Sequence, residues 1–117
     1  MTIHIKRAYE GPSNEDGQRI LVDRLWPRGI SKDAAKIDFW PKEISPSNEL
    51  RKWYGHEPEK WNEFRKRYFA ELDAQPEKVK ELLEYVQKGT VTFVYSSKEE
   101  RINNAVALKE YVEARIS

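Results

Sequence analysis

The stretch TVTFVY, residues 90–95, is the natural starting point for the fold of this chain. Its β-branched and aromatic residues follow Gly89, which ends a helical pattern, and they predict a buried strand. Three successive apolar residues, Ile20 to Val22, lie within the segment Arg19 to Leu25 and predict another strand, covered on both faces as in a parallel sheet. A long helical region separates the two, which is the natural connection between parallel strands.

Turn and cap signals predict the remaining elements. Ile3 and Ile5 alternate with polar residues, which is typical of a short first strand. Residues 10–17 collect turn formers and acidic groups, so they are expected to form an exposed, mobile loop. Helices are expected at residues 31–36 (capped by Ser31), at 46–54 (capped by Ser47 and closed by Gly55), from Pro58, from Pro76 to Gly89, and after a capping box formed by Ser97 and Glu100.

This order of elements predicts the fold class. A chain of 117 residues has room for one core and no second domain. We therefore expect a single α/β layered domain over residues 1–117, with a small, mainly parallel sheet flanked by helices.

The composition excludes several classes of partner and of reaction. The net charge is +1 with both signs interspersed, so no overall field favours nucleic acid or an anionic membrane. The absence of cysteine removes disulfides and thiolate chemistry. His4 is expected to be packed in the first strand and His56 to make a helix-entry contact; neither has metal-ligand spacing, so no metal and no cofactor are predicted. Without an apolar span or signal-peptide stretch, the sequence predicts a soluble cytoplasmic protein.

The ends of the predicted strands indicate where a ligand would bind. Ligands of open α/β sheets lie at the carboxyl ends of the strands, and here these ends carry cations in the sequences KRAY (6–9), DRLWPR (23–28) and YSSK (95–98). We expect an anion pocket there. Its predicted parts are Arg24 and Arg28 as a clamp, Lys98 and the helix amides after Ser97 as a cradle, and Trp26 and Tyr95 as walls.

Simpler interpretations remain open for the same residues. Ser97 with Glu100 is already explained as a helix cap. Arg24 or Arg28 could instead pair with Asp23 or with the carboxylate at position 38 to hold a loop. Asp23 is a candidate general base only if burial raises its pKa, so the sequence leaves catalysis undecided.

Aromatic residues support two further hypotheses. A partner-binding or regulatory module would use exposed aromatics of residues 39–54 as its contact surface. Nucleic-acid binding would use tryptophans interleaved with arginines, but Trp61 falls on a helical stripe with Phe64 and Tyr68, which favours core packing. An anionic small molecule is therefore the preferred partner, and the oligomeric state is left open.

Three segments resemble a known family: VDRLWPRG (22–29), the PS-ELR-W pattern (46–53) and YSSK followed by NNA (95–105). Together they resemble DUF488, in its short YeaO-like branch, over nearly the whole chain. The resemblance implies an α/β domain without an established activity. This chain lacks the cysteines that longer members carry after the last strand, and Asn104 stands where some short members have histidine. The resemblance implies site roles for Asp23, Arg24, Trp26, Pro27, Arg28, Ser47, Arg51, Trp53, Tyr95, Ser97, Lys98, Asn103 and Asn104, and it makes Asn103 and Asn104 candidate ligand contacts.

Overall fold

A three-stranded parallel sheet forms the centre of the computed structural model, which describes residues 2–116. The strands are β1 (Ile3–Arg7), β2 (Gln18–Leu21) and β3 (Val91–Tyr95), in the order β1-β3-β2. The register places Phe93 of β3 beside Ile5 on one side and Ile20 on the other. All five residues of β3 are buried. The parallel pairing predicted from the long helical crossover is confirmed.

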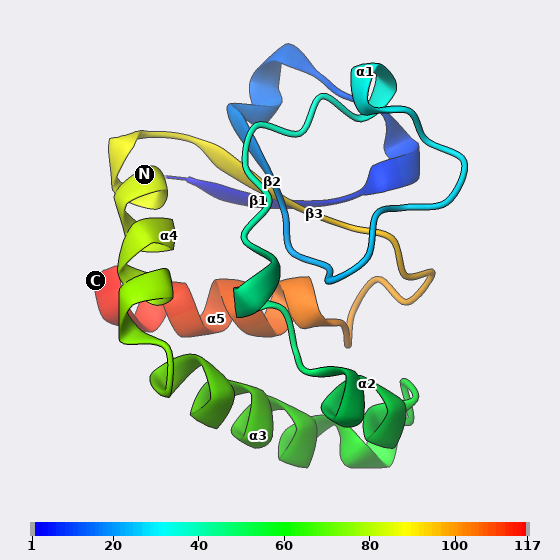
Figure 1. The fold of residues 1–117 in the computed structure, drawn as a ribbon, viewed down its shortest axis with the longest axis vertical. Coiled ribbons are helices and arrows are strands. Elements are labelled where there is room, and N and C mark those ends of the chain that lie inside the picture. The colour runs from blue at the N-terminus through cyan, green and yellow to red at the C-terminus, as the bar shows by residue number, and fades with distance from the viewer. Residues whose placement is uncertain (1, 117) are drawn as a thin grey trace.

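Five helices surround the sheet: α1 (Lys32–Ala35), α2 (Asn48–Tyr54), α3 (Trp61–Asp73), α4 (Pro76–Lys88) and α5 (Asn104–Ile116). Figure 1 shows α5 running beneath the sheet, with α3 and α2 forming a further layer below it. Two of the predicted caps are present: Ser31 and Ser47 accept from the amides at the third helical positions of α1 and α2. The predicted α/β class is confirmed.

Alternation along β2 divides its side chains between two apolar clusters. Ile20 and Val22 belong to the main core, which the helices cover. Leu21 packs with Val94 in a second cluster, against the partly buried Trp26 and Trp40 and their neighbours. All three successive residues of β2 and its extension are fully buried, as expected for a strand covered on both faces.

The second strand is shorter than predicted. β2 ends at Leu21 and not at Leu25, and the ladder closes with the Val22 amide donating to the Val94 carbonyl at 3.0 Å. One residue later, the Asp23 carboxylate accepts from the Ser96 amide at 2.8 Å. A side chain thus takes the place of the next backbone acceptor, and the following residues are free to form a loop.

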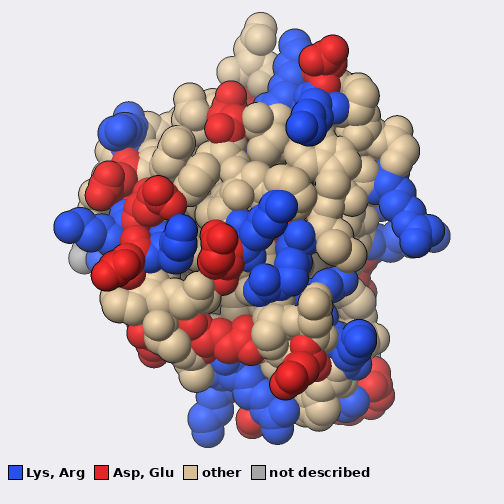
Figure 2. Space-filling model, in the orientation of Figure 1, with Lys and Arg blue, Asp and Glu red and all other residues tan. Residues whose placement is uncertain are grey.

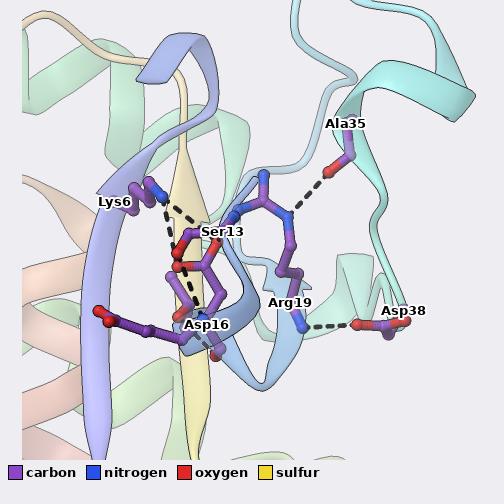
Figure 3. A network of polar contacts seen from close by, with 8 residues as sticks. Lys6, Ser13, Asp16, Arg19, Ala35 and Asp38 are labelled. Carbon is purple, nitrogen blue, oxygen red and sulfur yellow. Dashed lines mark hydrogen bonds and ion pairs between the residues drawn. The ribbon is translucent and has the colours of Figure 1, made fainter. Parts of the chain in front are cut away.

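The segment 10–17 is largely exposed, as its composition predicts, but one of its residues anchors it to the sheet. Ser13 caps a turn of 3-10 helix, η2 (Asn14–Asp16), and Asp16 is buried. The Asp16 carboxylate accepts from Arg19 at 2.6 Å and from Lys6 at 3.3 Å. Figure 3 shows this carboxylate between the two cations. The sequence did not predict this anchor because the cations come from β1 and β2, which only the folded sheet brings together.

The last helix begins later than predicted. Ser97 does not form a capping box with Glu100; its hydroxyl accepts from the Glu99 amide at 2.9 Å in a local turn. α5 starts at Asn104, and the buried Asn103 side chain supports its first turn by accepting from the Val106 amide at 3.0 Å. An asparagine cap replaces the predicted serine cap, so residues 97–103 form bends instead of a helical turn.

The first strand lies at an edge of the sheet. His4 of β1 is exposed, so the expectation of a packed imidazole was wrong. Ile3, one residue earlier, enters the main core. The helices therefore cover the isoleucine-bearing face of this strand, while the face that carries His4 is open to solvent at this point.

Candidate functional site

A pocket of about 800 Å³ opens at the carboxyl end of β2. Three segments supply most of its lining: residues 23–28 after β2, Ser96 and Ser97 after β3, and the region of α2 from Pro46 to His56. Tyr9, Phe64 and Asn104 complete it. Four cationic side chains line the pocket: Arg24, Arg28, Arg51 and Lys52. Asp23 is the one carboxylate among the described residues of the lining.

Asp23 ties the pocket walls together. Its Oδ2 accepts from both the amide and the hydroxyl of Ser96, at 2.8 and 2.7 Å. Its Oδ1 accepts from Asn104 Nδ2 at 3.1 Å. Both oxygens are thus used to join the ends of β2 and β3 to the start of α5. These contacts give Asp23 a structural role, while its tentative role as a general base stays a prediction.

Arg24 is held by backbone carbonyls. Its Nη2 donates to the Ser45 carbonyl at 3.0 Å, and its Nε approaches the Pro46 carbonyl at 3.4 Å. The Ser45 hydroxyl in turn donates to the Val22 carbonyl at 3.1 Å. These contacts fix the chain entering α2 against the end of β2. Arg24 therefore lines the pocket while part of its donor capacity serves the fold.

Arg28, Arg51 and Lys52 present exposed cationic side chains to the pocket. The Arg28 backbone is fixed by Tyr9, whose hydroxyl donates to its carbonyl at 3.0 Å. Arg51 donates to Asn48 Oδ1 at 3.0 Å within α2. Among residues 2–116, none of these three cations forms an ion pair. Figure 2 shows Lys and Arg side chains gathered near the centre of this face, with acidic side chains beside and below them, and the two signs mixed at its left edge.

The cations at the end of β1 do not join the pocket. Lys6 pairs with Asp16. The Arg7 Nε donates to the Ser97 carbonyl at 2.8 Å, so this guanidinium holds the chain after β3 and does not face a ligand. The expected convergence of cations from all three strand ends is therefore limited to the residues that follow β2, with α2 supplying the others.

Of the two predicted pocket walls, Trp26 and Tyr95, only Trp26 lines the pocket. Trp26 lines the pocket, and its ring is fixed by an Nε1 bond to the Ile30 carbonyl at 2.7 Å and by an edge contact with Trp40. Tyr95 is buried in the main core and does not line the pocket. Burial raises the pKa of Tyr95, and the nearby Glu100 raises it further, so the side chain is a neutral core group.

The predicted cradle after β3 is only partly formed. Ser97 lines the pocket, but the exposed Lys98 does not, and the amides after Ser97 belong to bends and not to a helix. Asn103 is fully buried as the cap of α5. Asn104 lines the pocket and donates to the Val22 carbonyl at 2.8 Å as well as to Asp23. Of the two asparagines, only Asn104 is placed to face a ligand.

A family model described as the inactive DUF488-N3 subclade matches residues 2–117. The chain belongs to this DUF488 subclade. It is 43% identical over 112 residues to the uncharacterized protein YeaO of Escherichia coli, which covers 96% of this chain and 97% of that protein. It is 38% identical over 113 residues to the uncharacterized proteins Mb3100c of Mycobacterium bovis and Rv3073c of Mycobacterium tuberculosis, which covers 97% of this chain and 95% of each. No solved structure matches the chain significantly.

The DUF488 resemblance identified Arg51 as a site residue, but several other residues that line the pocket were not predicted. Lys52, His56, Tyr9 and Leu25 also line it and were not predicted. The missing information was the position of α2 beside the end of β2. No local pattern indicates that position, because it depends on Arg24 and Ser45 contacts between segments about 20 residues apart.

The aromatics of residues 39–54 do not form the exposed contact surface proposed as an alternative. Phe39 stacks on Tyr85 with ring centroids 4.3 Å apart. Trp53 is partly buried beneath Arg67, whose guanidinium lies 4.2 Å from the ring centroid, and Tyr54 is buried. Phe39 thus packs on α4, and Trp53 and Tyr54 pack α2 against its neighbours, so this part of the DUF488-N3 domain offers no large apolar patch.

Two further observations concern the described residues of this DUF488-N3 domain. None of its helices is long and apolar enough to cross a membrane. Within residues 2–116 there is also no group of three or more histidines and carboxylates arranged to hold a metal ion.

Proposed function

We propose that this protein binds a small molecule carrying a phosphate or carboxylate group, in the pocket beside the carboxyl end of β2. The observation that carries the proposal is the presence of Arg28, Arg51 and Lys52 in the lining of one pocket without an ion-pair partner among residues 2–116. Cations gathered in this way repel one another, and an anion among them relieves the repulsion. Arginine also offers paired donors that match a phosphate or carboxylate.

Tyr54 adds no negative charge that would repel such a ligand. Tyr54 lines the pocket, and burial raises its pKa to about 12, with a smaller contribution from Glu99. Its hydroxyl donates to the Ile102 carbonyl at 2.6 Å. The Tyr54 hydroxyl is therefore neutral at neutral pH. Asp23 is the remaining negative group of the lining, and its oxygens already accept from Ser96 and Asn104.

The proposal is one of binding without turnover. Asp23 was the one candidate carboxylate at a predicted strand end, with a tyrosine as the other candidate proton carrier, and Asp23 holds the pocket walls together. The description of the subclade as inactive supports the same conclusion. The pocket volume is in the range of roughly 300 to 1,000 Å³ that is common for small-molecule sites.

Titration calorimetry with inorganic phosphate and pyrophosphate at low ionic strength tests this proposal. We expect Arg28→Gln and Arg51→Gln each to weaken pyrophosphate binding by about tenfold, because each removes charge-assisted hydrogen bonds. Lys80→Gln is the matched control, since Lys80 is an exposed cation of α4 that does not line the pocket. Equal affinity in all four proteins would show that the pocket cations do not bind the anion.

A nucleic-acid ligand is distinguished in the same experiment. Binding to many phosphates produces an affinity that falls steeply and linearly on a logarithmic salt scale. A compact anion held by three cations in one pocket gives a much shallower dependence. A steep salt dependence for a single-stranded oligonucleotide, together with no response to pyrophosphate, would overturn the small-molecule proposal.

A further inference from the structure

Two large apolar side chains are exposed among the described residues, and both line the cationic pocket. Tyr9 is 49% exposed and Leu25 is 64% exposed. Single exposed apolar residues are common on protein surfaces and need no explanation by themselves. Both residues line one pocket, beside unpaired cations from the loop of Leu25 and from α2. An inorganic anion would leave this apolar surface unused.

The Tyr9 side chain and the loop that carries Leu25 are both held in place by neighbouring residues. The Tyr9 hydroxyl donates to the Arg28 carbonyl at 3.0 Å, and the Arg7 guanidinium lies 5.2 Å from the centre of its ring. Leu25 lies between Arg24, which donates to the Ser45 carbonyl, and Trp26, which donates to the Ile30 carbonyl. The loop that presents Leu25 is therefore fixed on both sides. Such preorganisation lowers the entropic cost of binding an apolar group.

The pocket continues inward with apolar surface. Pro46, Tyr54 and Phe64 also line it, and all three are buried. The tilted ring of His56 lies against Tyr54, with centroids 5.4 Å apart. An apolar wall and floor thus adjoin the cationic side chains of α2, within a volume of about 800 Å³ that is much larger than one phosphate group.

We infer that the ligand is an amphipathic anion: a phosphate or carboxylate attached to a flat, apolar ring system, as in an aryl phosphate or a nucleoside phosphate. The anionic group would contact Arg28, Arg51 and Lys52, and the ring would cover Leu25 and Tyr9. This inference rests on the proposed anion binding and adds the class of ligand. The concave shape of the site favours such a small molecule over an extended peptide.

Phenyl phosphate, inorganic phosphate and phenol are the probes that test this inference, with affinities measured by titration calorimetry. We expect phenyl phosphate to bind roughly tenfold more tightly than phosphate, because the ring removes additional apolar surface from water. Phenol, which lacks the anion, is expected to show no detectable binding. Leu25→Ser should reduce phenyl phosphate affinity to near that of phosphate, and Leu25→Met should retain most of it. Since Leu25 is mostly exposed, neither change is expected to impair folding.

The outcomes separate the two proposals. Equal affinities for phosphate and phenyl phosphate, both weakened by Arg51→Gln, would overturn the amphipathic ligand and leave the anion site standing. Phenyl phosphate binding that is unchanged in Leu25→Ser would also overturn it, because the ring would then lie elsewhere. No binding of either phosphate would overturn both proposals together.

Discussion

Asp16 and Asp23 flank the same strand, β2, and have opposite surroundings. Asp16 is buried, and its carboxylate pairs with the cations of Lys6 and Arg19, as Figure 3 shows. Asp23 accepts only from uncharged donors of Ser96 and Asn104. At the amino end of β2, the cations Lys6 and Arg19 are paired with Asp16. The second end leaves the neighbouring arginines without a carboxylate partner among residues 2–116.

The difference separates a structural ion cluster from a candidate binding site. Arg19 is buried and donates to Asp16 and to the Ala35 carbonyl, so it joins η2, β2 and α1. Arg28 is exposed, faces a pocket, and is fixed only through its backbone. The number of arginines near strand ends does not distinguish a structural arginine such as Arg19 from a candidate ligand contact such as Arg28. The two are distinguished by the burial of the side chain and by the position of the nearest carboxylate.

Asp16→Asn should produce the largest loss of stability. It leaves the buried Arg19 without a countercharge, and removing one partner of a buried pair commonly costs about 3 kcal/mol or more. Urea unfolding measures this loss. The exposed Glu15 supplies the matched control, since Glu15→Gln should change the free energy of unfolding by less than about 0.5 kcal/mol. Equal effects of the two variants would contradict the structural role of the Asp16 cluster.

Asp23→Asn should destabilise the protein less than Asp16→Asn does, and it should strengthen anion binding. An amide cannot accept all three hydrogen bonds, so we expect a loss of about 2 kcal/mol. Removing a negative charge from the pocket should raise pyrophosphate affinity. Urea unfolding and calorimetry on the same preparation measure the two quantities. A large decrease in pyrophosphate affinity in a well-folded variant would show that Asp23 assists the ligand directly.

The pH dependence of stability should report on Asp16. Burial alone raises the pKa of this carboxyl, but the Ser13 amide and the cations Arg19 and Lys6 outweigh it, so the pKa lies below its usual value. The stabilisation is therefore complete above the unfolded pKa of about 3.9 and is lost as the pH falls through the lower folded value. In unfolding experiments from neutral to acidic pH, the wild-type advantage over Asp16→Asn should shrink below about pH 4. An advantage independent of pH would contradict this ionised pair.

Arg51→Gln and Lys52→Gln should have the smallest effect on stability. Both residues are exposed on α2, and neither forms an ion pair within residues 2–116. We expect the free energy of unfolding to change by less than about 0.5 kcal/mol while pyrophosphate affinity falls. A loss of stability comparable to that of Asp16→Asn would place these cations with the structural cluster.

The sequence predicts the framework better than it predicts the site. Local signals determine strands and helix ends. Examples are the run Ile20 to Val22, the stretch TVTFVY at residues 90–95, and the cap Ser47. The Asp16 cluster depends on Lys6 and Arg19, which approach only after the parallel strands pair.

Residues far apart in the chain also determine the site. The pocket depends on α2 lying beside the end of β2, a position set by contacts between Arg24, Ser45 and Val22. Cap signals can mislead as well, because Ser97 matched the usual pattern but the asparagine at position 103 caps α5. The predicted location at the carboxyl edge was useful because it followed from strand direction, which the helical crossover determines.

Mapping a phosphate-bearing ligand onto individual residues tests the central claim most directly. In a titration of the isotope-labelled protein with pyrophosphate, followed by amide chemical shifts, we expect changes at Arg28, Arg51, Lys52 and Ser97, and none at residues 13–19. Saturating shift changes confined to these four residues would agree with a pocket whose unpaired cations bind the anion. Changes centred on residues 13–19, or none at either end of β2, would contradict the account.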